Sequence, residues 1–276
     1  MTLQDRGGIA GARRVVVKVG SSSISGENAG KIGPIVDALA EAHARGTEVV
    51  LVSSGAIATG MPFLLLDARP SDLATQQAAA AVGQNVLIYR YQEALRPFEI
   101  VAGQVLLTAG DLENPTHRSN ARRAMERLLG LRILPIVNEN DTVATHEIRF
   151  GDNDRLAALV AQLIGADALV LLSDIETLYT RPPDEPGALP IRNVAFGDDL
   201  AGYQFGSVVV NSVGTGGAAT KVSAARLAST AGIAVLVTSA DLVHAALRGD
   251  EVGTWFAPNP EPAAPSITGS VRVPDA

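Results

Sequence analysis

The chain has 276 residues, of which 47% are hydrophobic and 4% aromatic, with no cysteine and a formal net charge of −7. This composition excludes a disordered chain and any disulfide or thiolate chemistry, and the negative charge argues against broad binding to a nucleic-acid backbone. The sequence holds neither an apolar run long enough to span a membrane nor an N-terminal signal segment, so we expect a soluble, cytoplasmic protein.

Short β-branched runs alternate with alanine-rich stretches along the chain. Because apolar strands separated by helices indicate βαβ units, the pattern predicts an α/β fold. We expect a three-layer sandwich in which a mainly parallel central sheet is covered by helices on both faces. The predicted strands are Arg14–Val19, Glu48–Ser53, Ile100–Leu107, Arg132–Val137, Ala168–Ser173 and Ile233–Thr238. The predicted helices are Ala29–Arg45, Asp72–Leu95, His117–Leu129, Asp154–Ile164, Ala218–Ala231 and Leu242–Arg248.

The predicted organisation is one folded part with a loose segment at each end. Residues 1–12 are expected to be disordered or flexible, and residues 13–257 to form the domain. Residues 258–276, rich in proline and small side chains, are expected to form a flexible tail. Inside the domain, residues 179–211 interrupt the alternation with a loop-like segment that holds one short strand.

The first predicted strand carries Lys18 near its end, followed by Gly20, Ser21, Ser22 and Ser23. A lysine on a strand that is buried on both faces is costly unless an anion pairs with it. The turn after it offers backbone N–H groups and hydroxyls at a helix start, which suits a phosphate group. The alternative is an exposed lysine at the edge of the sheet.

The second predicted strand is followed by Ser54, Gly55 and Ala56. Ligands of open α/β sheets bind beyond the carboxyl ends of the strands, and these small residues leave the backbone open to close approach. This loop is therefore a candidate ligand contact. Alternatively, Ser54 serves only as the N-cap of a helix.

Polar residues also follow the fourth and fifth predicted strands. Ser173 and Asp174 lie at the end of the fifth, and residues 138–154 after the fourth include five carboxylates and three asparagines. Carboxylates this close repel one another unless something positive or hydrogen-bonding lies between them. The candidates are Mg²⁺, a substrate ammonium group, or Lys18 and Lys221. The four histidines show no spacing typical of metal ligands.

Gly214, Thr215, Gly216 and Gly217 lead into a predicted helix with Lys221 near its first turn. A lysine there opposes the helix dipole, so a bound anion explains it better than solvent does. The loop lacks the Walker spacing, and no Rossmann fingerprint follows the first strand. It predicts a phosphate site of another kind, and the alternative is a flexible loop before an amphipathic helix.

Five motifs occur here in the order in which they occur in glutamate 5-kinases. They are Lys-Val-Gly-Ser-Ser, Ser-Ser-Gly-Ala-Ile, Asn-Glu-Asn-Asp, Gly-Asp-Asn-Asp and Gly-Thr-Gly-Gly-x-x-Thr-Lys. Each motif alone is weak, but five in register are specific. From about Arg14 to Ala257 the chain resembles these enzymes, which belong to the amino-acid kinase superfamily. The resemblance implies the amino-acid kinase fold, with an amino-acid-binding N-terminal part and a nucleotide-binding part from about residue 165.

The resemblance also implies an activity. ATP, with Mg²⁺, would phosphorylate the γ-carboxylate of L-glutamate to give L-glutamyl 5-phosphate and ADP, the first step of proline biosynthesis. It further implies proline as a feedback inhibitor and a homo-oligomeric assembly. By position, Lys18 and Lys221 resemble the lysines that hold the transferring phosphoryl group, and Asp154 resembles the acid that orients both.

The other residues implied by the resemblance fall into two groups. The glutamate-binding group is Ser54, Gly55, Ala56, Asn138, Asp141 and Asn153, with Asp141 as a partner for the substrate ammonium. The nucleotide-binding group is Lys18, Gly20, Ser21, Ser22, Ser173, Asp174, Gly214, Thr215, Gly216, Gly217 and Lys221. Mg²⁺ is expected on the ATP phosphates, and no protein ligand is assigned to it.

The chain departs from its relatives at two places. Thr177 stands where relatives usually carry glycine, within the expected nucleotide loop. Many relatives append a PUA domain, which resembles RNA-binding folds, whereas only about 20 residues follow Pro258. We therefore expect a form without that domain or a truncated chain.

Two other functions compete with this interpretation. Acetylglutamate kinase, carbamate kinase and aspartokinase share the lysine-glycine opening but should lack the Asn-Glu-Asn-Asp and Gly-Asp-Asn-Asp pair. A non-catalytic amino-acid sensor on a degenerate kinase fold would have lost Lys18, Asp154 or Lys221, and all three are present.

Overall fold

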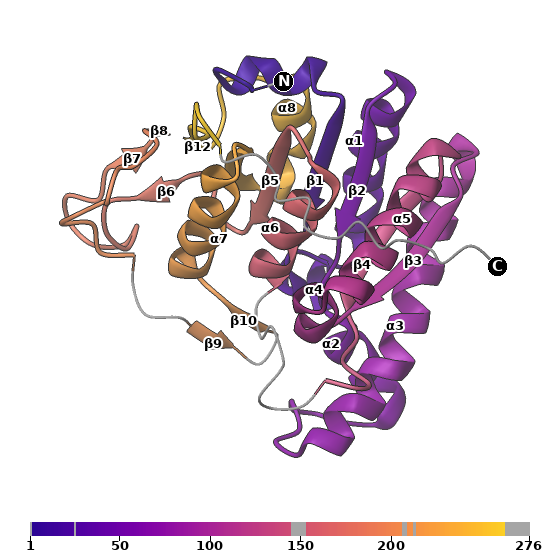
Figure 1. The fold of residues 1–276 in the computed structure, drawn as a ribbon. Helices are drawn as coiled ribbons and strands as arrows, with labels where there is room; N and C mark the ends of the chain where they lie inside the picture. The colour runs from indigo at the N-terminus through magenta and orange to yellow at the C-terminus, as the bar shows by residue number, and fades with distance from the viewer. Residues whose placement is uncertain (1, 25, 145–152, 206–208, 212–213, 263–276) are drawn as a thin grey trace.

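The computed structural model describes residues 2–24, 26–144, 153–205, 209–211 and 214–262. These residues form an eight-stranded sheet in the order β3-β4-β2-β1-β5-β11-β12-β8 (Figure 1). Neighbouring strands are parallel except β11 and β12, which are antiparallel. The strands are β1 Arg14–Lys18, β2 Glu48–Val52, β3 Ala102–Leu107, β4 Leu134–Glu139, β5 Ala168–Ser173, β8 Asn193–Val194, β11 Ala234–Ser239 and β12 Thr254–Phe256.

Helices cover both faces of the sheet, which confirms the predicted α/β sandwich. Buried side chains of α1, α3 and α8 share one core with the sheet, and those of α5, α6 and α7 share the other. The second group lies in front of the sheet in Figure 1. The helices are α1 Ile32–Ala44, α2 Ala56–Gly60, α3 Leu73–Leu95, α4 Ala109–Glu113, α5 Pro115–Gly130, α6 Asn153–Ile164, α7 Ala218–Thr230 and α8 Val243–Arg248.

The strands are apolar throughout because each of them contributes to both cores. In β1, Val15 and Val17 pack into the core with α1, whereas Val16 packs into the core with α6. Successive side chains of a strand point to opposite faces of the sheet, so a strand covered on both faces has no polar side. The continuous apolar runs of the sequence therefore correspond to the central strands of the sheet.

Most predicted elements are confirmed, with shifted ends. Strand β5 matches its predicted range, and α3 begins one residue later than predicted because Asp72 acts as its N-cap, accepting from the backbone N–H of Thr75. The first predicted helix begins at Ile32, because the preceding turn is a 3₁₀ helix, η3 Gly26–Lys31. Helix α5 begins two residues earlier than predicted, with Pro115 in its first turn and Asn114 as its cap.

The loop-like segment between β5 and α7 contains two small antiparallel sheets. Strand β6 (Leu178–Tyr179) pairs with β7 (Pro190–Ile191), and β9 (Val209–Asn211) pairs with β10 (Gly214–Gly216). The short strand predicted in this segment is β9, although the first residues of the predicted run lie outside the described residues. This segment is therefore structured, although outside the main alternation.

The N-terminal segment is packed, where the sequence predicted a disordered or flexible one over residues 1–12. Residues Arg6–Gly11 form a 3₁₀ helix, η1, and Leu3 and Ile9 are buried. The Arg6 guanidinium donates to the backbone carbonyls of Val252 and Arg192. These contacts of Arg6 anchor the segment. The composition of residues 1–12 did not indicate them, because the partners are distant in the sequence. Of the predicted tail, residues 258–262 are described, and the rest lies outside the described residues.

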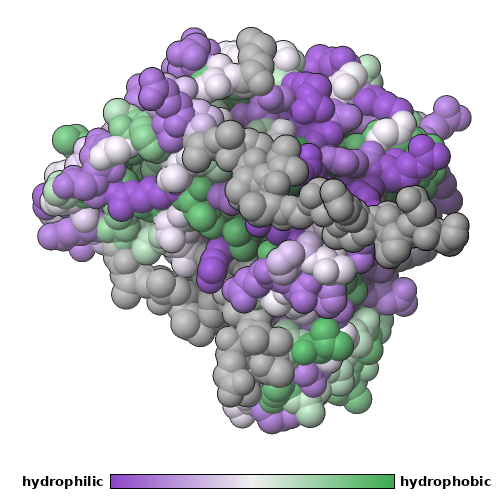
Figure 2. Space-filling model, viewed as in Figure 1, coloured by the Kyte–Doolittle hydropathy of each residue, from purple (hydrophilic) through white to green (hydrophobic). Residues whose placement is uncertain are grey.

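Figure 2 shows hydrophilic side chains over most of one face of the molecule, with apolar surface at its lower edge, over α3. The exposed apolar side chains of this region come from α3 and from the 3₁₀ helix η4 (Met61–Leu64) and the residue after it, and they include Phe63, Leu65, Val82 and Tyr89. Within the ranges given above, none of the helices has the length and apolar character that a membrane span requires.

Candidate active site

The predicted site residues gather where parallel strands end. Lys18, the last residue of β1, pairs in register with Val52 of β2 and Leu171 of β5, so these strands end at nearly the same level. The chain leaves β1 towards β2 and later returns to β5 on the other side of β1, which is where ligands of such sheets bind. At this edge lie Gly20, Ser21 and Ser22 after β1, Ser54, Gly55 and Ala56 after β2, Asn138 near the end of β4, Ser173 at the end of β5, and Asp174.

The loops after β1 and β2 are in contact. Gly55 has φ of 86°, a left-handed conformation that glycine adopts without strain. A side chain at this position would also come within 3.3 Å of the Cβ atom of Ser21. The glycine therefore permits both the turn into α2 and the approach of the two loops.

Three buried charged side chains form the centre of the site. Asp154, in the first turn of α6, is completely buried, and its Oδ1 lies 2.6 Å from Nζ of Lys18. Its Oδ2 lies 3.1 Å from Nζ of Lys221, in the first turn of α7. Lys18 is 5% exposed and Lys221 6%. The prediction that Asp154 faces both lysines is therefore confirmed as geometry, and the two cations outnumber the one carboxylate.

The charge state of Asp154 follows from this arrangement. Burial alone would raise its pKa, because a low-dielectric surrounding disfavours the charged carboxylate. The charges of Lys18 and Lys221, and their hydrogen bonds to the carboxylate, outweigh burial and lower the pKa from 3.8 to about 2. The carboxylate is therefore ionised at neutral pH and keeps both lysines in place.

Thr220 adds a third contact to this carboxylate. Its Oγ1 lies 3.0 Å from Oδ2 of Asp154 and 2.9 Å from the carbonyl oxygen of Gly217, and it accepts from the backbone N–H of Gly217. The single hydroxyl proton is better used on the carboxylate, because hydrogen bonds to charged groups are stronger. Thr220 thus connects the glycine loop before α7 to the lysine–aspartate centre.

A network of side-chain amides lies beside this centre. Nδ2 of Asn153 donates to Oγ of Ser54 at 2.9 Å and to Oδ1 of Asn138 at 3.3 Å. Nδ2 of Asn138 in turn donates to Oε1 of Gln84, a buried residue of α3, at 2.7 Å. The structure therefore brings together three residues that the sequence predicted to bind the amino acid, and adds a fourth.

The predicted nucleotide residues that follow β5 and that precede α7 lie on the other side of β1 from this network. Ser173 pairs with Ser239 of β11, and its Oγ donates to the Asp174 carboxylate at 3.0 Å. Gly214, Thr215 and Gly216 form β10, and Gly217 immediately precedes α7. The glycine loop is therefore a short strand followed by a helix start, and its role as a phosphate site stays a prediction.

Asp141 is the acidic residue of the predicted glutamate-binding group. It lies half-buried in the turn after β4, and its role as a partner of the ammonium group stays a prediction. Part of the carboxylate-rich stretch, including Glu147 and Asp152, lies outside the described residues.

Thr177, the departure from the relatives, is buried in the loop that follows β5. Its Oγ1 lies 2.8 Å from Oγ1 of Thr254 and 3.0 Å from the carbonyl oxygen of Ile191. Thr254 also accepts from the backbone N–H of Leu178. The side chain at this position thus joins the residues of β6, β7 and β12.

The sequence missed Gln84 and Thr220 as members of the site. Thr220 stands in the last of the five motifs, one residue before Lys221, so its place in the motif was a usable signal. Gln84 lies in an alanine-rich helix, where the available signal is one amide on the buried face that also holds Leu87 and Tyr91.

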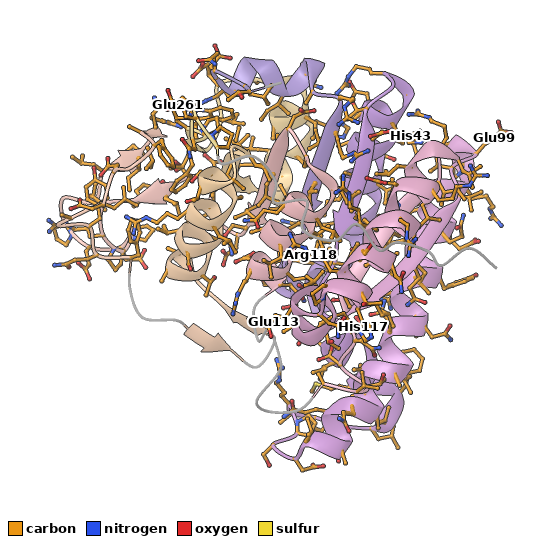
Figure 3. All side chains as sticks on the ribbon, viewed as in Figure 1. His43, Glu99, Glu113, His117, Arg118 and Glu261 are labelled. Carbon is orange, nitrogen blue, oxygen red and sulfur yellow. The ribbon has the colours of Figure 1, made fainter. Side chains whose placement is uncertain are left out.

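His43 and His117 lie apart from each other. Figure 3 shows His43 and His117 on separate parts of the molecule, and Nδ1 of His117 lies 3.0 Å from the Asp111 carboxylate. In the part of the chain that the structure describes, no three His, Asp or Glu side chains converge in a way that could hold a metal ion.

Comparisons with known proteins agree with this geometry. A model of the amino acid kinase family matches residues 13–239. The chain is 72% identical over 270 residues to a glutamate 5-kinase of Leifsonia xyli subsp. xyli, which covers 98% of this chain and 100% of that protein. It is 73% identical over 258 residues to a glutamate 5-kinase of Clavibacter michiganensis subsp. michiganensis, which covers 94% of this chain and 99% of that protein.

A solved structure supports the fold alone. Carbamate kinase from Giardia lamblia, bound to AMP-PNP, matches with a TM-score of 0.67 at 16% sequence identity, covering 91% of this chain and 100% of that chain. The family match spans β1 to β11 and so includes Lys18, Asp154 and Lys221, the three residues of the buried centre. On the family match, the fold and the two near full-length relatives together, the chain belongs to the amino acid kinase family.

Proposed function

We propose that this protein is a glutamate 5-kinase, which transfers the γ-phosphoryl group of ATP to the γ-carboxylate of L-glutamate. The products are L-glutamyl 5-phosphate and ADP, and the reaction is the first step of proline biosynthesis. The relatives named above support this substrate pair. The structural observation that carries the proposal is the buried centre in which Asp154 holds Lys18 and Lys221.

The reaction does not require a strong general base. A substrate carboxylate is already ionised, so one of its oxygens attacks the γ-phosphorus directly. The new P–O bond forms as the bond to the β,γ-bridging oxygen breaks, and ADP leaves with that electron pair. Catalysis then depends on in-line positioning and on neutralising charge on the migrating phosphoryl group.

Lys18 and Lys221 are proposed to supply that positive charge. The centre carries two cations and one carboxylate, so one positive charge is left over for an incoming phosphoryl group. Asp154 is proposed to position the ammonium groups, because its two oxygens each contact one of them. Buried and preorganised charges act more strongly than exposed ones, since little solvent has to be rearranged.

The remaining site residues are proposed to divide by position. The glutamate side is Ser54, Gly55, Ala56, Asn138, Asp141 and Asn153, near the ends of β2 and β4 and the start of α6. The ATP side is Gly20, Ser21, Ser22, Ser173, Asp174 and the loop from Gly214 to Gly217. The glutamate side and the ATP side meet at the end of β1. Lys18, at that end, would act on the phosphoryl group as it passes between them.

Mg²⁺ is proposed to bind to the phosphate oxygens of ATP. The donor set fits this arrangement, because both oxygens of Asp154, the carboxylate at the centre, are already engaged by lysines. When bound, the ion would neutralise phosphate charge and favour departure of ADP.

The proposal is tested by an ADP-release assay with L-glutamate, N-acetylglutamate, aspartate and carbamate as acceptors. Hydroxylamine trapping would detect the acyl phosphate. We expect turnover with L-glutamate. Lys18→Ala and Lys221→Ala should lose mainly kcat, and both variants should still fold, because Asp154 keeps one lysine partner in each. Turnover with N-acetylglutamate but not glutamate would contradict the assignment.

Three finer points belong to the same proposal. Proline is proposed as a feedback inhibitor that competes with glutamate, which its similar carboxylate and amine chemistry supports. A homo-oligomer is proposed, and the exposed apolar side chains of Phe63, Leu65 and Tyr89 offer surface that a second copy could cover. A cytoplasmic location is proposed from the sequence.

A further inference from the structure

We propose that Gln84 of α3 is a positioning residue for the amino-acid substrate, although it lies behind the residues that would touch that substrate. Gln84 contacts the side-chain amide of Asn138, which contacts the amide of Asn153, which in turn contacts the hydroxyl of Ser54. Gln84 would therefore help to orient all three groups. This inference rests on the proposed function, because it concerns the glutamate side of the same site.

The direction of every hydrogen bond in this network is set at one point. The backbone N–H of Glu139 lies 2.9 Å from the side-chain oxygen of Asn138. A backbone N–H only donates, so the Asn138 atom that faces it must be the oxygen. The nitrogen of the same amide therefore points the other way, and it meets Oε1 of Gln84 at 2.7 Å.

The fixed orientation of Asn138 is passed on to Asn153. The Asn138 oxygen accepts, so the Asn153 atom facing it at 3.3 Å is the nitrogen. That nitrogen also donates to Oγ of Ser54 at 2.9 Å, and Ser54 acts there as an acceptor. If Asn138 turned over, its nitrogen would face both the Glu139 N–H and the Asn153 nitrogen, and the network would break.

Two groups emerge from this network with unused capacity. Oδ1 of Asn153 is a buried acceptor for which the described residues supply no donor. Ser54, having accepted from Asn153, keeps its own hydroxyl proton for another acceptor. A buried acceptor without a donor is costly, and a ligand that supplies one would recover that cost. An amino acid supplies both partners, with ammonium protons for Asn153 and carboxylate oxygens for Ser54.

Gln84 is held rigidly enough to act as the anchor. It is 9% exposed, and it shares the buried face of α3 with Leu87 and Tyr91. The preceding residue, Gly83, lies so close to α2 that a side chain there would overlap the carbonyl oxygen of Ala56. Since Ala56 follows Ser54 and Gly55 at the end of β2, this contact fixes the position of Gln84 relative to the hydroxyl that it ultimately orients.

The same face of α3 makes a second contact with this loop. The hydroxyl of Tyr91, completely buried, lies 3.0 Å from Oγ of Ser53. Gln84 and Tyr91 are seven residues apart, about two helical turns, so they lie on one face of α3. Their partners, Asn138 and Ser53, lie at the carboxyl ends of β4 and β2. Helix α3 therefore supports the glutamate side of the site at two points. Of these, Gln84 holds the side-chain nitrogen of Asn138, while the Glu139 N–H holds its oxygen.

Gln84→Met tests the inference, because methionine has a similar size and no oxygen to accept from Asn138. We expect the KM for glutamate to rise about tenfold, the loss of roughly one buried hydrogen bond, while kcat and the KM for ATP change less than about threefold. In Gln84→Glu an acceptor oxygen remains within reach of Asn138, so the KM for glutamate should stay within about threefold of wild type.

Gln92→Leu is the matched control on the same helix. Gln92 accepts from the backbone N–H of Ala102 and donates to the carbonyl oxygen of Ile100, at the other end of the strands. Its loss should lower the melting temperature and leave both KM values unchanged. Calorimetric titration of glutamate into each variant measures binding without turnover, and should show the same loss in Gln84→Met.

The outcomes separate this inference from the proposed function. If wild type does not phosphorylate glutamate, the proposed function fails. If wild type does so and Gln84→Met keeps the wild-type KM for glutamate, the positioning role is wrong. An equal rise in both KM values in Gln84→Met, or a similar loss in Gln92→Leu, would also overturn it, because each would indicate general disturbance of the fold.

Discussion

Asp154 is a single carboxylate on which two buried cations depend. Its oxygens lie 2.6 Å from the ammonium of Lys18 and 3.1 Å from that of Lys221. Removing the charge leaves two buried ammonium groups facing each other without a counter-charge. We expect Asp154→Asn to be about 3 kcal/mol less stable than wild type at neutral pH, and to lose at least about a hundredfold in kcat.

The stability difference should depend on pH. The pKa of Asp154 is lowered from 3.8 to about 2 in the folded protein, so its contribution to stability is complete above the unfolded value and is lost as pH falls through the folded one. The gap between wild type and Asp154→Asn should therefore narrow by about 2 kcal/mol between about pH 4 and pH 2. Urea unfolding at each pH measures it, and a constant gap would contradict the assigned ionisation.

Thr220 is expected to affect the rate more than binding. Its hydroxyl contacts the same oxygen of Asp154 as Lys221 does, at 3.0 Å, so Thr220→Val loosens the carboxylate without removing a charge. We expect kcat to fall about tenfold, the size of one hydrogen bond to a charged group. Thr230→Val is the control in the same helix, because its hydroxyl donates to the carbonyl oxygen of Arg226, one turn earlier and far from the carboxylate in sequence. Equal kcat values in Thr220→Val and Thr230→Val would contradict the role assigned to Thr220.

At this scale the sequence predicted the charged residues and missed those that orient them. Lys18 and Lys221 were recognisable because a cation beside an apolar strand or at a helix start needs an anion. Gln84 was not, because its function depends on which atom of a neighbouring amide faces it. That information exists only once β4 and α3 are packed together.

Among the elements, the contact between α2 and α3 is the tightest constraint on the glutamate side. A side chain at Gly60 would overlap the carbonyl oxygen of Ala79, and one at Gly83 would overlap that of Ala56. The two backbones therefore touch, and the helices have no room to adjust around a methyl group. The identity of both glycines is set by this crossing and not by the turns that glycine usually serves.

Gly83→Ala should separate these helices. We expect a loss of stability of about 3 kcal/mol, the upper range for overpacking, together with a raised KM for glutamate because Gln84 moves with the backbone. Gly33→Ala in α1 is the matched control, since nothing lies within 4 Å of the added carbon. That variant should be neutral or stabilised by up to about 1 kcal/mol. Thermal unfolding of both compares them, and similar melting temperatures would refute the close contact.

The central strands and long helices were predictable because their patterns are long and local. Strand β12 was missed because three residues, Thr254–Phe256, are too short to show a period. Its pairing with β11 and β8 depends on contacts between distant parts of the chain. The pairing of β9 with β10 was missed for the same reason, although β9 itself was expected.

At the scale of the whole molecule, the N-terminal segment ties the far edge of the sheet to the rest. Arg6 is 3% exposed and donates to Arg192 O at 2.8 Å, Asn193 Oδ1 at 2.7 Å and Val252 O at 3.1 Å. These acceptors belong to β8 and the loops beside β8 and β12, so one side chain closes the edge that the short strands leave weak.

Arg6→Met should therefore destabilise the protein without changing its chemistry. We expect a loss of about 3 kcal/mol, because part-buried acceptors lose a charged donor at three points, with kcat and both KM values unchanged. Glu251→Ala is the control, since its carboxylate reaches Arg6 at 3.5 Å but is 90% exposed, and such pairs contribute little. A chain whose unfolding midpoint in urea is insensitive to Arg6→Met would show that the segment is only loosely attached.

The burial of the two central lysines has a practical consequence for the whole chain. Lys18, Lys31 and Lys221 are the three lysines in the sequence, and Lys31 is the one with an exposed side chain. An amine-acylating reagent should therefore modify one lysine, beyond the α-amino group, while the centre stays closed. Lys18 and Lys221 should be acylated only when the site opens. The rate at which intact mass spectrometry detects the second and third acyl groups on lysine therefore measures how often the phosphoryl-transfer centre is exposed.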